Sequence, residues 1–367
     1  MKFKCSRSDL SNALSNVQRA VSTKASFPAL EGILIKAYPD NTLRLSGYDL
    51  EIGIITEIEA SVSQPGETVV SARLVSDIVR KLPEEIIEIY TDEKLITYIK
   101  SGYADYQIVG MSPDDYPDLP TFNARDELVI NAGLLKNMIR QTIYAVSEVK
   151  DTPVYTGSYY EITENQLRIV AVDGFRMAIR TEAVKCSPVM PFVVPAKTQS
   201  EVLRLITDDE AEIKLEIGRR HIAYKVGNYS VISRLIEGTF INYQNTIPKE
   251  SNTEFVIKTK RLLDAVDRMS IISNDKIKIP VRCKIEKDGI MLTCSTAVGK
   301  ATDFIETPFT GNDVTIGFNY KFLSDALRYA ETDEVKISIK GSLEPMTITP
   351  LNSDSFLFLV VPMRISF

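Results

Sequence analysis

The residue types that most often perform chemistry are sparse in this chain. Its 367 residues include a single histidine, His221, so a metal site built from several histidines is excluded. Four cysteines stand far apart with no CxxC pair, which indicates reduced thiols and neither a disulfide framework nor a zinc site. These are Cys5, Cys186, Cys283 and Cys294. We expect no metal and no cofactor.

Carboxylates are abundant, and an acid–base pair or a two-metal site would require them to converge. They occur instead as short runs in expected turns, such as Glu84–Glu85, Asp114–Asp115 and Asp208–Glu210. The sequence contains no GxSxG, no glycine-rich phosphate loop and no HExxH motif. We therefore predict that the protein is not an enzyme.

Basic residues offer a different chemistry, the binding of phosphates. The formal net charge of −6 excludes a uniformly basic nucleic-acid binder. Six expected helical stretches nevertheless carry +12 together, which leaves −18 for the rest of the chain. They are residues 2–24, 73–81, 134–150, 197–204, 258–268 and 321–328. Either these helices have ordinary solvated faces, or they form one positive surface that attracts phosphates without reading sequence.

A triplication organises these elements. Val69–Arg73 resembles Val193–Lys197 and Thr315–Asn319, at offsets of 124 and 122 residues. A turn-and-strand pattern recurs at nearly the same period, in Asp40–Leu45, Glu164–Ile169 and Lys287–Leu292. Because this period greatly exceeds that of a solenoid repeat, each copy is a whole domain.

Each third reads as helix, strands, a second helix and further strands, and the strands alternate apolar and polar residues. We predict an α+β protein of three similar domains, each with two helices packed on antiparallel sheets. Proline-rich joints place the boundaries at 1–121, 122–249 and 250–367. No apolar run of about 18 residues is present, so no transmembrane helix is expected. The opening Met1–Cys5 lacks a signal-peptide pattern, and we expect a cytoplasmic protein.

Two heptads carry a family resemblance. Val172–Ala178 and Leu359–Ile365, with the opening Met1–Phe3, closely resemble the bacterial sliding clamps, the β subunits of the replicative DNA polymerase III. The resemblance runs along the whole chain without large insertions. It implies the DNA clamp fold, assembled as a head-to-tail homodimeric ring that encircles duplex DNA. It also implies a non-enzymatic processivity factor, opened by a clamp loader, that tethers the polymerase III catalytic subunit and other proteins with clamp-binding motifs.

The resemblance further implies a hydrophobic pocket for partner peptides between the second and third domains. The residues at the matching positions are Tyr155, Val172, Gly174, Phe175, Arg176, Met177, Ile241, Asn319, Phe322, Leu343, Pro345, Leu359, Val360, Val361, Pro362, Met363 and Arg364. Apolar walls suit Leu or Phe anchors, and Met177 and Met363 would adapt to several ligands. Arg176 and Arg364 are expected to hold peptide groups at the rim.

The chain departs from the family pattern around this pocket. Phe175 stands where the family often has histidine, and Ile241 and Asn245 lie in a segment that commonly contains proline and arginine. The tail Ile365–Phe367 extends past the usual leucine end. These departures concern the rim of the pocket and its ligand preference.

For DNA contact, Lys24 and Arg73 match basic positions of the family, and Lys197 repeats Arg73 in the second domain. Helix periodicity adds Arg80, Lys136 and Arg140. For the dimer interface, the family pattern indicates Tyr106 and Ile108 on an edge strand, facing Ile271 and Ile272 of the other protomer. The alternative function is a peptide-binding scaffold unrelated to DNA, which would leave the basic helices unexplained.

Overall fold

The computed structural model describes residues 1–22, 27–273 and 279–365, and its chain groups into two compact units. The first unit contains residues 1–134 and 197–235, and the second contains residues 135–196 and 236–367. The central third of the chain is thus divided between the units. Its strands explain the division, because some of them continue a sheet of the first third and others a sheet of the last third.

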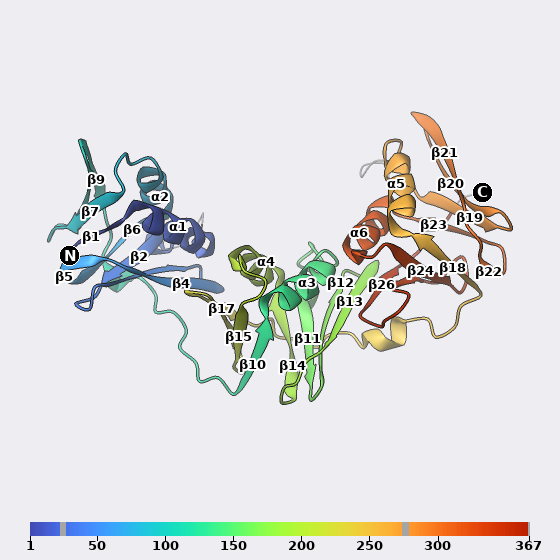
Figure 1. Cartoon of the computed structure of the whole chain (residues 1–367), viewed down its shortest axis with the longest axis horizontal. Helices are drawn as coiled ribbons and strands as arrows, with labels where there is room; N and C mark the ends of the chain where they lie inside the picture. Colours follow the sequence, from blue (N-terminus) through green and yellow to red (C-terminus); the bar gives the residue numbers. More distant parts are fainter. Residues whose placement is uncertain (23–26, 274–278, 366–367) are drawn as a thin grey trace. The chain divides into compact units, whose positions relative to one another are not determined.

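The first unit holds two antiparallel sheets and the helices α1 (Arg7–Val17), α2 (Ala72–Arg80) and α4 (Ala196–Leu205) (Figure 1). The five-stranded sheet has the order β5 (Ser61–Gln64), β1 (Lys2–Ser6), β7 (Ile86–Thr91), β8 (Ile96–Ser101) and β9 (Ala104–Val109). The eight-stranded sheet has the order β10 (Asp126–Asn131), β15 (Glu212–Ile217), β16 (His221–Val226), β17 (Tyr229–Arg234), β4 (Ile52–Glu59), β3 (Thr42–Tyr48), β2 (Gly32–Ala37) and β6 (Gly66–Ser71).

The second unit holds most of α3 (Ala132–Ile143), together with α5 (Thr259–Ser270) and α6 (Tyr320–Ala330). Its nine-stranded sheet has the order β14 (Val189–Pro195), β11 (Gly157–Thr163), β12 (Gln166–Val172), β13 (Arg176–Ala183), β26 (Phe356–Val360), β25 (Met346–Thr349), β24 (Glu334–Ile339), β18 (Thr253–Lys258) and β22 (Thr310–Gly311). Its four-stranded sheet has the order β21 (Gly299–Glu306), β20 (Gly289–Thr296), β19 (Val281–Glu286) and β23 (Val314–Phe318).

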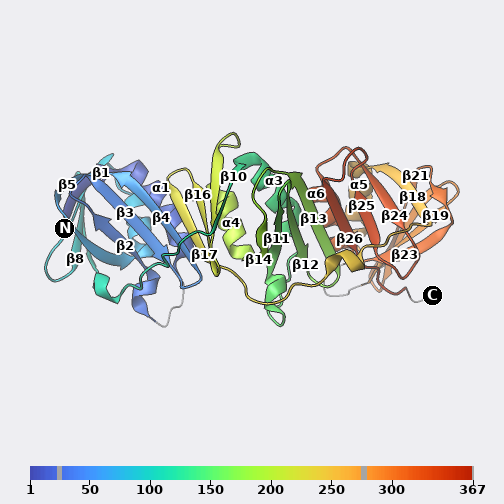
Figure 2. The ribbon, with the colours of Figure 1, turned by 90° about the horizontal axis from the view of Figure 1, so that it is seen from below.

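One strand pair in each unit joins successive thirds of the chain. In the first unit β17 extends the sheet beyond β4, and in the second unit β26 extends the sheet beyond β13 (Figure 2). Helices α2, α4 and α6 begin at Ala72, Ala196 and Tyr320, so the starts are 124 residues apart in both steps. The predicted three-domain α+β architecture is therefore confirmed, while the domain boundaries themselves stay a prediction.

The helices are amphipathic and pack their apolar sides onto the sheets. In α5 the buried residues Leu262, Val266 and Met269 recur at helical spacing, and α6 packs beside this helix over the same core. All four cysteines are free, as predicted. Burial raises the pKa of Cys5 and Cys283 to about 12, so these thiols stay protonated near neutral pH.

The predicted helix over residues 2–24 is wrong for its first five residues, which form strand β1. Phe3 and Cys5 point into the core, whereas Lys2 and Lys4 point outward and contact Glu88 at 2.7 and 3.6 Å. This two-residue alternation is the pattern of a strand. The six α-helices as formed contain twelve Lys and Arg and six Asp and Glu, which gives +6 and leaves −12 elsewhere. The predicted difference in net charge between the helices and the rest of the chain keeps its sign but is smaller.

Glu85 makes the start of α1 sensitive to acid. Its carboxylate accepts hydrogen bonds from the hydroxyl of Ser8, from the Ser8 backbone N–H at 3.0 Å and from the Ser6 hydroxyl at 2.8 Å. These bonds lower the pKa of Glu85 from 4.5 to about 2. The stability that they contribute is complete above the unfolded pKa and is lost as pH falls through the folded one.

We therefore expect the thermal unfolding midpoint to fall less steeply in Glu85→Gln than in the parent protein when pH is lowered from about 5 to about 3, because glutamine carries no charge to neutralise. Circular dichroism melts across this range measure the difference. Glu93→Gln, which removes a carboxylate from an exposed turn, serves as the control. Parallel pH profiles for the parent and Glu85→Gln would contradict the prediction.

Candidate peptide-binding and DNA-facing surfaces

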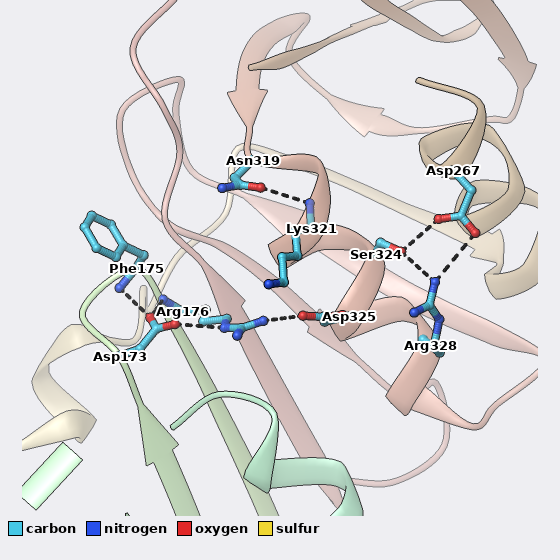
Figure 3. A network of polar contacts seen from close by, with 9 residues as sticks. All are labelled: Asp173, Phe175, Arg176, Asp267, Asn319, Lys321, Ser324, Asp325 and Arg328. Atoms are coloured by element: carbon cyan, nitrogen blue, oxygen red, sulfur yellow. Dashed lines mark hydrogen bonds and ion pairs between the residues drawn. The ribbon is translucent and has the colours of Figure 1, made fainter. Parts of the chain in front are cut away.

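The turn between β12 and β13 presents an aromatic side chain on a rigid frame. Asp173 Oδ1 accepts hydrogen bonds from the backbone N–H groups of Phe175 and Arg176, both at 2.9 Å. Gly174 has a φ of +90°, a conformation that L side chains rarely adopt. The result is a tight turn that leaves the Phe175 side chain 62% exposed (Figure 3).

Arg176 joins this turn to helix α6. Its Nε donates to Asp173 at 2.9 Å, and one terminal nitrogen donates to Asp325 at 2.6 Å (Figure 3). The guanidinium also lies 4.7 Å from the ring centroid of Phe322 and 5.4 Å from that of Tyr144. Because the side chain is nine-tenths buried and engaged on all these sides, its main role is to link the turn to α6. This differs from the predicted role of holding peptide groups at the rim.

An apolar surface lies beside the turn, formed by the exposed Phe175 and the partly buried Phe322 over a buried cluster. Met177 on β13 is paired with Leu359 on β26, and both pack in a cluster with Val172, Tyr243 and Ile179. Phe175 stacks on Phe322 with ring centroids 6.1 Å apart. Apart from Tyr243, which lies in the 3-10 turn η5 (Tyr243–Thr246), these residues come from three elements of the second unit: the β12–β13 hairpin, β26 and α6. The structure thus brings together the two heptads that the sequence singled out.

Val360 differs from its neighbours in this set. Side chains of a strand alternate between faces, and Leu359 contributes to the apolar cluster while Val360 lies fully buried in the core under α5 and α6. The pocket position predicted for the Val360 side chain is therefore corrected. Leu343 and Ile241 are exposed, whereas Tyr155 packs edge-on against Phe240 at 5.7 Å.

The C-terminal segment continues away from the turn along β23. The backbone N–H of Val361 donates to the carbonyl of Phe175 at 2.8 Å, and that of Met363 donates to the carbonyl of Gly317 at 2.8 Å. Asn319 caps α6 by accepting from the Lys321 N–H at 2.9 Å, so its side chain has a structural role (Figure 3). Pro345, Pro362 and Met363 are partly buried, and Arg364 is exposed.

Sequence reasoning missed three aromatic residues of this surface. Phe240 stacks on Tyr159 at 4.8 Å, and Tyr243 meets Tyr159 at 6.2 Å. The Tyr243 hydroxyl donates to Glu161 at 2.9 Å and accepts from Arg168 at 3.0 Å. Burial raises the pKa of Tyr243. These residues lie outside both heptads, and only the alternation of Tyr159 in its strand hinted at a shared face.

The predicted DNA-contact residues that the structure describes stand on helices, and most contact a carboxylate. Arg73 and Lys197 each occupy the second position of their helix, α2 and α4. Arg80 pairs with Asp77 at 2.6 Å, Arg140 pairs with Glu331 at 2.7 Å, and Lys197 pairs with Asp49. Lys136 is partly buried on α3. Lys24 lies outside the described residues.

The predicted dimer residues lie at two sheet edges. Strand β9 is the edge of the five-stranded sheet, where Tyr106 is 42% exposed and Ile108 is buried at 7%. Ile271 directly follows α5 and is 79% exposed, whereas Ile272 packs partly against the core. Strand β21 is the edge of the four-stranded sheet. The side chain of Ile108 therefore packs in the core, and only its backbone lies at the sheet edge.

Comparison with known proteins decides the family. Models of the N-terminal, central and C-terminal domains of the DNA polymerase III beta subunit match residues 1–120, 129–242 and 244–364. The chain belongs to this family. Curated beta sliding clamps from Bacillus subtilis (strain 168) and Staphylococcus aureus (strain Mu50) are each 30% identical to it, over 99% of this chain and at least 99% of theirs.

Solved structures agree with this membership in the beta-subunit family. The DNA polymerase sliding clamp from Bacillus subtilis has a TM-score of 0.96 at 30% identity and covers all of both chains. A putative DNA polymerase III beta subunit from Eubacterium rectale has a TM-score of 0.95 at 32% identity over 99% of both chains. The predicted clamp fold is thereby confirmed. In the described part of the chain, no helix is long and apolar enough to span a membrane.

Proposed function

We propose that this protein is a DNA sliding clamp, a processivity factor that encircles duplex DNA and tethers the replicative polymerase and other replication and repair proteins. The full-length match to three clamp domains in register carries this proposal. The protein acts in the cytoplasm without catalysis or a cofactor of its own. Its macromolecular partners are duplex DNA, a second copy, the polymerase III catalytic subunit, a clamp loader and other proteins with clamp-binding motifs.

The charge distribution supports DNA inside the ring. The six helices carry +6 and the remaining chain −12, so the helices attract phosphates while the rest of the chain is net negative. Exposed ion pairs contribute only about 0–1 kcal/mol, so phosphates compete readily with carboxylate partners such as Asp77 and Glu331. Arg73, Arg80, Lys136, Arg140, Lys197 and Lys24 are the contacts we propose. Weak contacts suit a protein that is retained by topology and must slide.

Repetition of the internal strand pairs supports ring closure by a second copy. Within the chain β4 pairs with β17 and β13 pairs with β26. The strands left at the third equivalent position are β21 and β9, both sheet edges. Within the chain, Ala178 on β13 lies opposite Phe358 on β26. If β21 pairs with β9 of the other copy in the same register, Ala301 lies opposite Tyr106. Exposed apolar residues cluster at these edges: Tyr103, Tyr106 and Val109 at one, Ile271, Val298 and Phe304 at the other.

The apolar surface beside the β12–β13 turn is the proposed site for partner peptides. The exposed Phe175 and the partly buried Phe322 provide a wall for Leu or Phe anchors, backed by the buried Met177 and Leu359. Met363 adds an adaptable contact. Hydrophobic anchors in a groove with few polar contacts allow one site to receive many linear peptides. Boundaries near residues 121 and 249 would place this site between the central and C-terminal domains.

Topological retention tests the function. The protein is loaded onto nicked circular DNA with a clamp loader and ATP, and bound protein is separated by gel filtration in high salt. We expect retention on the circle and release after a restriction enzyme linearises it, because only a closed ring is held without strong contacts. Salt-sensitive binding that is equal on circular and linear DNA would contradict the clamp. Absence of any DNA retention together with peptide binding would favour the scaffold.

A further inference from the structure

A basic groove crosses the outer face of the four-stranded sheet. It has a volume of about 740 Å³ and is bordered by four cationic residues, Arg282, Lys284, Lys300 and Arg364. Among the described residues that line it there is no carboxylate. Neither the clamp fold nor the sites above require such a concentration of positive charge on a face of the sheet turned away from the helices.

The sheet register explains why the cations gather. Arg282 and Lys284 alternate on β19 with Cys283 and Ile285, which are buried in the core. Lys300 on β21 pairs with Ser295, which lines the same groove from β20. The basic side chains of β19 and β21 therefore stand on one face of the sheet, on either side of β20. Lys284 also contacts Glu286, so part of its charge is balanced.

The groove continues the proposed peptide site. The C-terminal segment starts at Val361, whose backbone N–H donates to the Phe175 carbonyl. It then runs over β23 and brings Arg364 and Ile365 to the groove. Gly317 permits this path, since a Cβ there would lie 2.7 Å from Ile365 Cγ1 and 3.0 Å from the Met363 carbonyl oxygen. A peptide seated at Phe175 and Leu359 that continued along this segment would enter the groove.

We propose that the groove binds an acidic flank of the partner peptide whose apolar anchors occupy the site beside Phe175. This inference rests on the proposed function and specifies its ligand. The cations match Asp and Glu side chains, while Ile279, Met291 and Ile365 in the lining contact the aliphatic parts of the flank. The described lining contains no aromatic side chain on which a nucleic-acid base would stack, which favours a peptide over a single strand.

The experiment uses the full-length protein and three fluorescent peptides with the same Leu and Phe anchors. They carry a Glu-rich, a Gln-rich or a Lys-rich flank, placed on either side of the anchors in separate sets. Anisotropy titrations at low and at physiological salt measure the dissociation constants. The parent protein should bind the Glu-flanked peptide about fivefold more tightly than the Gln-flanked one, and salt should reduce this gain.

Matched variants locate the effect. Arg282→Gln/Lys284→Gln should abolish the gain from the Glu flank and leave affinity for the Gln-flanked peptide unchanged. Lys287→Gln/Lys336→Gln removes the same charge outside the groove and should retain the gain. Circular dichroism melts verify that both variants fold.

Each contrary result has a distinct meaning. Equal affinity for Glu and Gln flanks in the parent protein, or a gain that survives in Arg282→Gln/Lys284→Gln, overturns the groove proposal while the peptide site stands. Failure of all three peptides to bind refutes the peptide site itself. A single-stranded oligonucleotide that binds the parent and not the groove variant, with no effect of the Glu flank, would assign the groove to nucleic acid and overturn the proposal.

Discussion

Replacing Ile271 with aspartate is expected to convert the dimer into a monomer. Ile271 is 79% exposed in the single chain. It directly follows α5, which packs against the edge strand β21. Closure would bury the new carboxylate among apolar side chains, at a cost of about 3 kcal/mol or more. Two interfaces close each ring, so the cost is incurred twice. Sedimentation equilibrium over a range of concentrations measures the change.

Two further variants make this result specific. Tyr106→Asp alters the opposite edge and should give the same monomer. Met190→Asp alters an equally exposed apolar side chain on β14, away from both edges, and should remain a dimer. If Ile271→Asp sediments at twice the chain mass, the interface lies elsewhere and the pairing of β21 with β9 is refuted.

Replacing Arg176 with methionine is expected to lower the free energy of unfolding by about 3 kcal/mol, the range observed when one member of a buried ion pair is removed. Methionine preserves most of the packing but leaves Asp173 and Asp325 without their shared partner. The turn that carries Phe175 would also lose its connection to α6, so affinity for a Leu- and Phe-anchored peptide should fall. Denaturant unfolding and anisotropy measure the two effects.

The control for this variant is Arg328→Met, on helix α6. Arg328 is more than half exposed and lies 3.7 Å from Asp267, so its removal should cost less than about 0.5 kcal/mol and spare peptide binding (Figure 3). Adding Asp173→Asn and Asp325→Asn to Arg176→Met should recover part of the loss, because no unpaired carboxylate then remains. Equal destabilisation by Arg176→Met and Arg328→Met would contradict the buried link.

Local patterns in the sequence were sufficient for the architecture. The recurrence of Val69–Arg73 at 124 and 122 residues predicted three equivalent domains, and the helices after these segments begin 124 residues apart. Hydrophobic periodicity distinguishes helix from strand because each element has its own repeat. Val172–Ala178 and Leu359–Ile365 identified the family because the two heptads occur together in a triplicated chain.

Other features depended on contacts between residues far apart in the chain. In the sequence Arg176 is a cation available for binding. Only the folded chain shows that it pairs with Asp325, 149 residues later. Tyr243 is held beside the apolar cluster by hydrogen bonds to Glu161 on β11 and Arg168 on β12.

Side-chain direction was the second feature that only the folded chain could settle. The heptad Leu359–Ile365 contains both Leu359 and Val360, but pairing with β13 turns Leu359 into the cluster beside the β12–β13 turn and Val360 into the core under α5 and α6. The same holds for Lys2 and Lys4. The sequence predicts them in a helix, whereas in the fold they lie on β1, which pairs with β7. Periodicity reports which residues share a face, whereas the identity of that face is set by the element packed against it.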